Sequence, residues 1–140
     1  EAMRHAWGGY YKYALGDDEL RPVTKSGSNN FGRIGITVLD SLDTLWLMGL
    51  MEDYEAAEDW VVKRLTFNRD VYVSVFETTI RALGGLLSAY DLTGRQVFID
   101  KAVDLGDRLL KAYDTKTGIP YASVNLATGD GRFEAAGAYG

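Results

Sequence analysis

The fold of this chain is decided by the stretch Ser74-Val75-Phe76-Glu77-Thr78-Thr79-Ile80-Arg81-Ala82-Leu83-Gly84-Gly85-Leu86-Leu87-Ser88-Ala89-Tyr90. At about 100° per residue this stretch predicts a helix, with its polar and smallest residues on one narrow stripe. That stripe contains Ser74, Glu77, Arg81, Gly84 and Ser88. The rest of the circumference is apolar, so the helix is expected to be largely buried.

The carboxylate of Glu77 has two interpretations in such a helix. Burial of a charge costs free energy unless the charge is paired or used. Glu77 could pair with Arg81, one turn away, and neutralise both charges in a core. It could instead be a catalytic acid that faces a cavity, with Gly84 and Ser88 leaving room above it. Position alone gives the two interpretations equal weight.

Composition limits the classes of protein to which the chain can belong. Its 140 residues are 46% hydrophobic and 25% charged, which suits one globular core. The net charge of -5 and the scattered basic residues argue against a nucleic-acid partner. No apolar run reaches the roughly 18 residues that a membrane span requires. The absence of cysteine and the single histidine, His5, exclude thiolate and multi-histidine metal sites within these residues.

A second apolar helix is expected at residues 34–50, closed by Gly49. Its polar residues also share a face, and they are Thr37, Asp40, Ser41 and Thr44, with Asp43 to one side. The segments 2–14, 51–65 and 96–113 instead predict conventional amphipathic helices with a charged, solvent-facing side.

Nearly apolar and amphipathic helices therefore alternate along the chain. This alternation predicts an all-α fold in two layers, with inner helices that line a cavity and outer helices that face solvent. A single antiparallel bundle is the alternative. Residues 18–22 read as a charged turn and residues 25–30 as a polar loop. A short strand at residues 121–126 predicts a β-hairpin or loop near residues 118–132.

Several of these stretches, in order, resemble the class I alpha-1,2-mannosidases of glycoside hydrolase family 47. The long block around Glu77 is the most specific, and the resemblance covers the chain up to about Arg132. The other matching stretches are His5-Ala6-Trp7-x-x-Tyr10, Asp18-Glu19-Leu20-Arg21-Pro22, Leu39-Asp40-Ser41-Leu42-Asp43-Thr44-Leu45, and Gly118-Ile119-Pro120-Tyr121 through Asn125-Leu126.

The resemblance implies a barrel of seven inner and seven outer helices, an (α/α)7 barrel, plugged at one end by a hairpin. Residues 1–140 would then be the N-terminal part of a single barrel catalytic domain, apparently truncated. Residues 133–140 follow the family pattern only loosely.

The resemblance also implies an activity, the removal of terminal alpha-1,2-linked mannose from high-mannose N-glycans with inversion. Glu77 aligns with the proposed acid of the family, which delivers its proton through a water, and Arg81 aligns with an arginine near the sugar subsites. Asp40 and Asp43 lie in an acidic motif and are expected to bind substrate or its water network, or alternatively to cap or pair within the core. The Asp18 turn is either rim structure or a substrate contact.

The base, the other active-site carboxylates and the threonine that holds Ca²⁺ in this family lie in later segments. The chain is therefore expected to supply the acid but no metal ligand and no complete site. One alternative is a mannose-recognising quality-control protein of the same superfamily with little hydrolysis. Another is a stand-alone helical scaffold without chemistry. The family implies the secretory pathway, in the endoplasmic reticulum or Golgi, or secretion, with membrane association only through N-terminal segments outside this chain.

Overall fold

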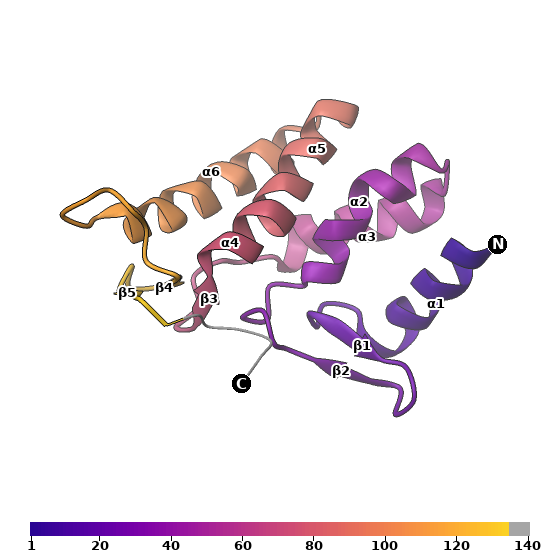
Figure 1. Ribbon diagram of the computed structural model, residues 1–140. Helices are drawn as coiled ribbons and strands as arrows, with labels where there is room; N and C mark the ends of the chain where they lie inside the picture. The colour runs from indigo at the N-terminus through magenta and orange to yellow at the C-terminus, as the bar shows by residue number, and fades with distance from the viewer. Residues whose placement is uncertain (135–140) are drawn as a thin grey trace.

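The computed structural model describes residues 1–134, so residues 135–140 of the expected domain lie outside the described part. The chain is mostly helical (Figure 1). Its α-helices are α1 (Ala2–Ala14), α2 (Ile36–Leu47), α3 (Met51–Arg64), α4 (Val75–Glu77), α5 (Gly84–Thr93) and α6 (Gln96–Leu110). A π-helical segment, Thr78–Leu83, joins α4 to α5, and Lys111–Tyr113 adds a 3-10 turn after α6. We call the continuous helix 75–93 the Glu77 helix.

The helices pack in the expected two layers (Figure 1). Helix α2 packs against α5, and each of the two is covered by the helix that follows it, α3 on α2 and α6 on α5. Side-chain contacts join Asp40 to Arg81 and Asp43 to Ser88. The residue numbers therefore increase in the same direction along the two neighbouring helices. Helices α2 and α5 are therefore parallel, which excludes the single antiparallel bundle.

The Glu77 helix is buried on one side only, so the expectation of a largely buried helix is wrong for its other side. The buried side carries Val75, Thr78, Ala82, Leu86 and Ala89. The opposite side exposes Phe76, Ile80, Leu87 and Tyr90. The reason is that the described neighbours, α2 and α6, cover only the first side.

Two small antiparallel sheets complete the described part. Strands β1 (Glu19–Arg21) and β2 (Ser26–Ser28) form a hairpin where a turn and a loop were expected. Strands β3 (Tyr72–Ser74), β4 (Ser123–Asn125) and β5 (Gly131–Arg132) form the second sheet, in that order. The hairpin of β4 and β5 confirms the prediction for residues 118–132, whereas β3 was not expected.

The second sheet fixes the start of the Glu77 helix. Val73 of β3 pairs with Val124 of β4, and Val75 N donates a hydrogen bond to Ala122 O at 3.0 Å. The hairpin therefore holds the residues that immediately precede Glu77. None of the helices described combines the length and the apolar character that a membrane span needs.

Candidate functional site

Glu77 lies in the first turn of its helix. Ser74 is the N-cap, and its Oγ accepts a hydrogen bond from Glu77 N at 3.3 Å. A serine followed three residues later by glutamate is a known signature of a helix start. This spacing fixes the position of Glu77 relative to the start of the helix, and helical periodicity alone does not reveal it.

The Glu77 carboxylate is neither buried nor tightly paired. Its side chain is 40% exposed, and its ion-pair contact is Glu77 Oε2 to Arg81 NH1 at 4.0 Å. This distance is at the outer limit of an ion pair, and an exposed pair contributes little. The interpretation of a neutralised Glu77–Arg81 pair inside a core is therefore wrong, and solvent reaches the carboxylate.

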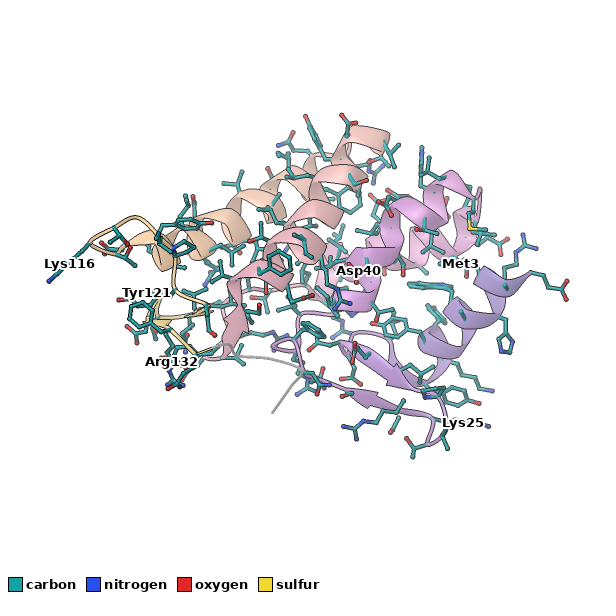
Figure 2. The ribbon with its side chains drawn as sticks, in the orientation of Figure 1. Met3, Lys25, Asp40, Lys116, Tyr121 and Arg132 are labelled. Atoms are coloured by element: carbon teal, nitrogen blue, oxygen red, sulfur yellow. The ribbon has the colours of Figure 1, made fainter. Side chains whose placement is uncertain are left out.

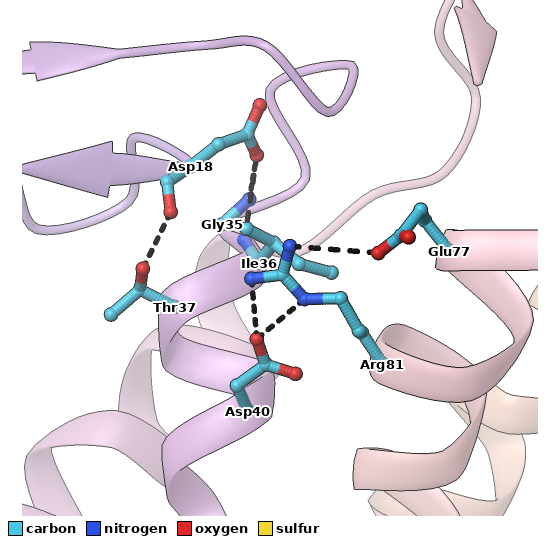
Figure 3. A network of polar contacts seen from close by, with 7 residues as sticks. All are labelled: Asp18, Gly35, Ile36, Thr37, Asp40, Glu77 and Arg81. Atoms are coloured by element: carbon cyan, nitrogen blue, oxygen red, sulfur yellow. Dashed lines mark hydrogen bonds and ion pairs between the residues drawn. The ribbon is translucent and has the colours of Figure 1, made fainter. Parts of the chain in front are cut away.

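The guanidinium of Arg81 is held mainly by Asp40 of α2 (Figure 3). Arg81 Nε donates to Asp40 Oδ2 at 2.8 Å, and Arg81 NH2 contacts the same oxygen at 2.6 Å. Charge-assisted contacts of this length are among the stronger hydrogen bonds in proteins. Asp40 lies on the side of α2 that faces the Glu77 helix (Figure 2). The structure thus brings three of the four predicted site residues together: Glu77, Arg81 and Asp40.

Arg81 lies within the π-helical segment Thr78–Leu83. Gly84 N donates to Thr79 O, five residues earlier, and Thr79 Oγ1 donates to Val75 O at 2.6 Å. Short π-helical segments occur frequently at functional sites. The apolar pattern of residues 74–90 gave no sign of this widened turn.

Asp43 lies one turn further along α2 and has a different set of partners. Its Oδ2 accepts a hydrogen bond from Ser88 Oγ at 2.8 Å, and its Oδ1 accepts one from Thr44 Oγ1 at 3.4 Å. Ser88 therefore binds Asp43 rather than simply leaving space above Glu77. For Asp43 this arrangement is the pairing alternative, and a role in sugar binding stays a prediction.

Asp18 is the structural residue of the turn at residues 18–22, and a substrate contact by the rest of that turn stays a prediction. The Asp18 side chain is fully buried, at 0% exposure. Its carboxylate accepts backbone hydrogen bonds from Phe31 (2.9 Å), Arg33 (2.7 Å), Ile34 (2.8 Å), Gly35 (2.9 Å) and Ile36 (3.4 Å). The N-cap of α2 is Gly35, which has no side chain for capping, so Asp18 supplies the acceptor from a distant turn.

Helix α1, which is rich in aromatic residues, packs against this turn. Trp7 and Tyr10 are buried, and Tyr10 Oη donates to Asp17 O at 2.7 Å. His5, by contrast, is exposed. Trp7 is thus a core residue, as is usual for an aromatic side chain on an amphipathic helix.

Residues 1–134 contain no group of three or more His, Cys, Asp or Glu side chains that could hold a metal ion. They therefore offer no cluster of these side chains on which a calcium site could be built. Ca²⁺ in the complete domain stays a prediction.

Known proteins share both the sequence and the fold of this chain. Residues 2–138 match the model of glycosyl hydrolase family 47, further than the resemblance traced to about Arg132. Mannosyl-oligosaccharide 1,2-alpha-mannosidase MNS1 of Arabidopsis thaliana is 56% identical over 130 residues, which are 93% of this chain and 23% of that protein. The endoplasmic reticulum mannosyl-oligosaccharide 1,2-alpha-mannosidase of Homo sapiens is 54% identical over 129 residues, which are 92% of this chain and 18% of that protein.

Among solved structures, the alpha-1,2-mannosidase from Trichoderma reesei superposes with a TM-score of 0.86 at 31% sequence identity. The match covers 94% of this chain and 30% of that one. This agreement confirms the expected fold, part of an (α/α)7 barrel of inner and outer helices.

The family match and the superposition of the fold agree with each other. The chain belongs to glycosyl hydrolase family 47. It spans about a fifth of the length of the curated relatives named here.

Proposed function

We propose that the protein to which this chain belongs removes terminal alpha-1,2-linked mannose from high-mannose N-glycans, with inversion at the anomeric carbon. The names of the relatives support the substrate and the bond. The single observation that carries the assignment within this chain is the placement of Glu77, a solvent-accessible carboxyl group at a fixed helix start beside a held arginine.

Inversion requires two carboxyl groups on opposite faces of the sugar. One gives its proton to the glycosidic oxygen as the bond to the anomeric carbon breaks, while the other takes a proton from the attacking water. We assign the first role to Glu77, acting through a water. The second role needs a carboxylate outside residues 1–140.

Glu77 is free to contact a water because it is not held in a short ion pair. Here Asp40 occupies the Nε and NH2 side of Arg81, and Arg81 NH1 lies 4.0 Å from Glu77 Oε2. The arginine can therefore orient the acid without binding it tightly.

Asp40 and Arg81 are better candidates than Asp43 for contacts with sugar hydroxyls. Asp43 uses both of its oxygens within the protein. Asp40 uses only Oδ2 in its contacts with Arg81, which leaves Oδ1 as a free acceptor among the described residues. The NH1 donor of Arg81 then lies next to the proposed acid, and Asp40, with its free acceptor, contacts the Nε and NH2 side of the same guanidinium.

The remaining parts of the proposal depend on the family. We expect the complete domain to bind Ca²⁺ through residues outside this chain, because residues 1–134 offer no cluster of His, Cys, Asp or Glu side chains for the ion. We expect the enzyme to meet its glycoprotein substrates in the secretory pathway, in the endoplasmic reticulum or Golgi, or after secretion.

The test is Glu77→Gln in the full-length protein, which removes the proton and keeps the shape of the side chain. Loss of a general acid typically costs about 10²- to 10⁴-fold in rate. The matched control is Glu52→Gln, on an exposed position of α3. Mannose release from a high-mannose glycan should fall by that factor for Glu77→Gln and stay unchanged for Glu52→Gln, with unchanged thermal unfolding for both. Near wild-type turnover of Glu77→Gln would reject the assignment.

The same assay addresses the quality-control alternative. NMR of the first-formed sugar should show β-mannose from the wild-type protein, as inversion requires. A wild-type protein that binds the glycan and releases no mannose would instead establish recognition without hydrolysis. No observation on residues 1–134 favours that outcome.

A further inference from the structure

We infer that Phe31 is a positioning residue for the Arg81 guanidinium, and that Asp18 holds both Phe31 and Asp40 in the places that this task requires. The inference rests on the proposed function, because Arg81 matters to the reaction only if Glu77 is the acid. It concerns residues outside the acidic motif and outside the Glu77 helix.

The first connection runs from Asp18 through the Phe31 ring to the guanidinium. Asp18 Oδ2 accepts hydrogen bonds from Phe31 N at 2.9 Å and Arg33 N at 2.7 Å, which fixes the backbone at Phe31. The Phe31 ring is buried, at 8% exposure, and the guanidinium carbon of Arg81 lies 4.5 Å from its centroid. This is a cation–π contact.

The second connection runs from the same carboxylate to the edge of the guanidinium (Figure 3). Asp18 Oδ1 accepts hydrogen bonds from Ile34 N at 2.8 Å and Gly35 N at 2.9 Å, where α2 begins. Asp18 O also accepts one from Thr37 Oγ1 at 2.6 Å. The start of α2 is thereby fixed, and with it Asp40, which lies about one turn further on.

The ring is needed because the Asp40 contact is incomplete as a restraint. Two parallel N–H···O bonds to two carboxylate oxygens would set both the direction and the plane of a guanidinium. Here Nε and NH2 of Arg81 meet a single oxygen, Asp40 Oδ2. The guanidinium can pivot about one oxygen, and the Phe31 ring, over which its carbon lies at 4.5 Å, supplies a second restraint. Phe31 therefore determines where NH1, the nitrogen next to Glu77, points.

The competing role for Phe31 is simple core packing. Substitutions that keep or remove the aromatic ring distinguish this role from the positioning of Arg81. Phe31→Leu keeps an apolar side chain and removes the π face. Phe31→Tyr keeps the face. The matched control is Phe98→Leu, which makes the same change at a fully buried position of the outer helix α6.

The kinetic experiment uses the full-length protein with each variant, corrected for the folded fraction. We expect Phe31→Leu to lower kcat/KM about tenfold, within the range of a desolvated cation–π contact, mainly through kcat. Phe31→Tyr should restore it to within about twofold, because Tyr and Phe both present a π face to the cation, and Phe98→Leu should leave it unchanged. In an Arg81→Gln background Phe31→Leu should cause no further loss, since a positioning residue acts only through the group it positions. The inference is overturned if Phe31→Leu keeps the kcat/KM of the wild-type protein. It is also overturned if Phe31→Leu causes an additive loss in the Arg81→Gln background.

A spectroscopic measurement separates failure of this inference from failure of the proposed function. In arginine-labelled full-length protein, the Nε–H signal absent from Arg81→Lys identifies Arg81. That signal should shift and broaden in Phe31→Leu and persist in Phe31→Tyr, whether or not the protein cleaves mannose. An unchanged signal in Phe31→Leu overturns the inference, whereas a wild-type protein without mannosidase activity overturns only the proposed function.

Discussion

Gly85 of α5 lies directly against the backbone carbonyl of Leu39 in α2. A Cβ atom at residue 85 would be 2.5 Å from Leu39 O, closer than real Cβ contacts. At the neighbouring Gly84 the nearest atom to such a Cβ is Thr79 O at 3.7 Å, an ordinary contact. The close approach of α2 and α5, which allows Asp40 to reach Arg81, therefore depends on Gly85 and not on Gly84.

These two adjacent glycines offer a matched test of helix packing. Gly85→Ala should destabilise the full-length protein by about 1–3 kcal/mol, because backbone on both sides must move apart. Gly84→Ala should be neutral or stabilise by about 0.5–1 kcal/mol, since alanine is the better helix former. Denaturant unfolding measures both. Equal effects of the two substitutions would show that the helices do not pack through residue 85.

Asp18 should be far more sensitive to substitution than its neighbour Asp17. An amide in place of the Asp18 carboxylate turns a donor group toward backbone N–H groups that need acceptors, and each unsatisfied buried group costs about 1–3 kcal/mol. We expect Asp18→Asn to destabilise the protein by about 3 kcal/mol or more. The Asp17 side chain accepts one exposed hydrogen bond, from Asn29 Nδ2 at 2.8 Å.

Asp17→Asn is therefore the control for Asp18→Asn, with an expected change below about 1 kcal/mol. Both changes alter the net charge equally, so a difference between them reports the buried contacts alone. Similar thermal midpoints for the two variants would contradict the clamp that the structure shows around Asp18.

The folded protein is expected to lose stability at alkaline pH because of Tyr54. Burial, followed by the nearby Glu58 carboxylate, raises the pKa of Tyr54 from 10.0 to about 12. Between these values the unfolded chain loses the phenolic proton while the folded protein retains it, so the free energy of unfolding falls as pH rises. The stability present below pH 10 is lost progressively toward pH 12.

The measurement is urea unfolding across that pH range for wild type and Tyr54→Phe. The variant should show a shallower decline. Some decline should remain, because burial also raises the pKa of Tyr10. Identical slopes for the two proteins would show that Tyr54 ionises in the folded state as easily as in the unfolded chain.

Periodicity predicted the helices well because each has one consistently apolar side. Helices α1, α3 and α6 lie where their patterns indicated, and the alternation of helix types indicated the two layers. The strands of β1 and β2 were missed because three residues such as Ser26-Gly27-Ser28 contain no alternation of apolar and polar side chains. Strand β3 depends on pairing with β4, a contact distant in sequence that no local pattern reveals.

The sequence pointed to Glu77, Arg81 and Asp40, which the structure brings together, but not to the contacts among them. Glu77 and Arg81 share a helical face, so a pair between them was a natural expectation. The structure instead gives the short contacts of Arg81 to Asp40, on another helix. Spacing within one helix cannot rank a neighbour one turn away against a residue from a different segment. Phe31 lies in a loop without periodicity, and only the coordinates place it against Arg81.

The pairing of β3 with β4 also sets an order of events during synthesis. Strand β3 immediately precedes Glu77, yet its partner Val124 leaves the ribosome only after the whole of α5 and α6. Glu77 is thus translated early and anchored late. A nascent chain that stops before residue 123 would contain Glu77 but not strand β4, so β3, which precedes Glu77, would lack its partner.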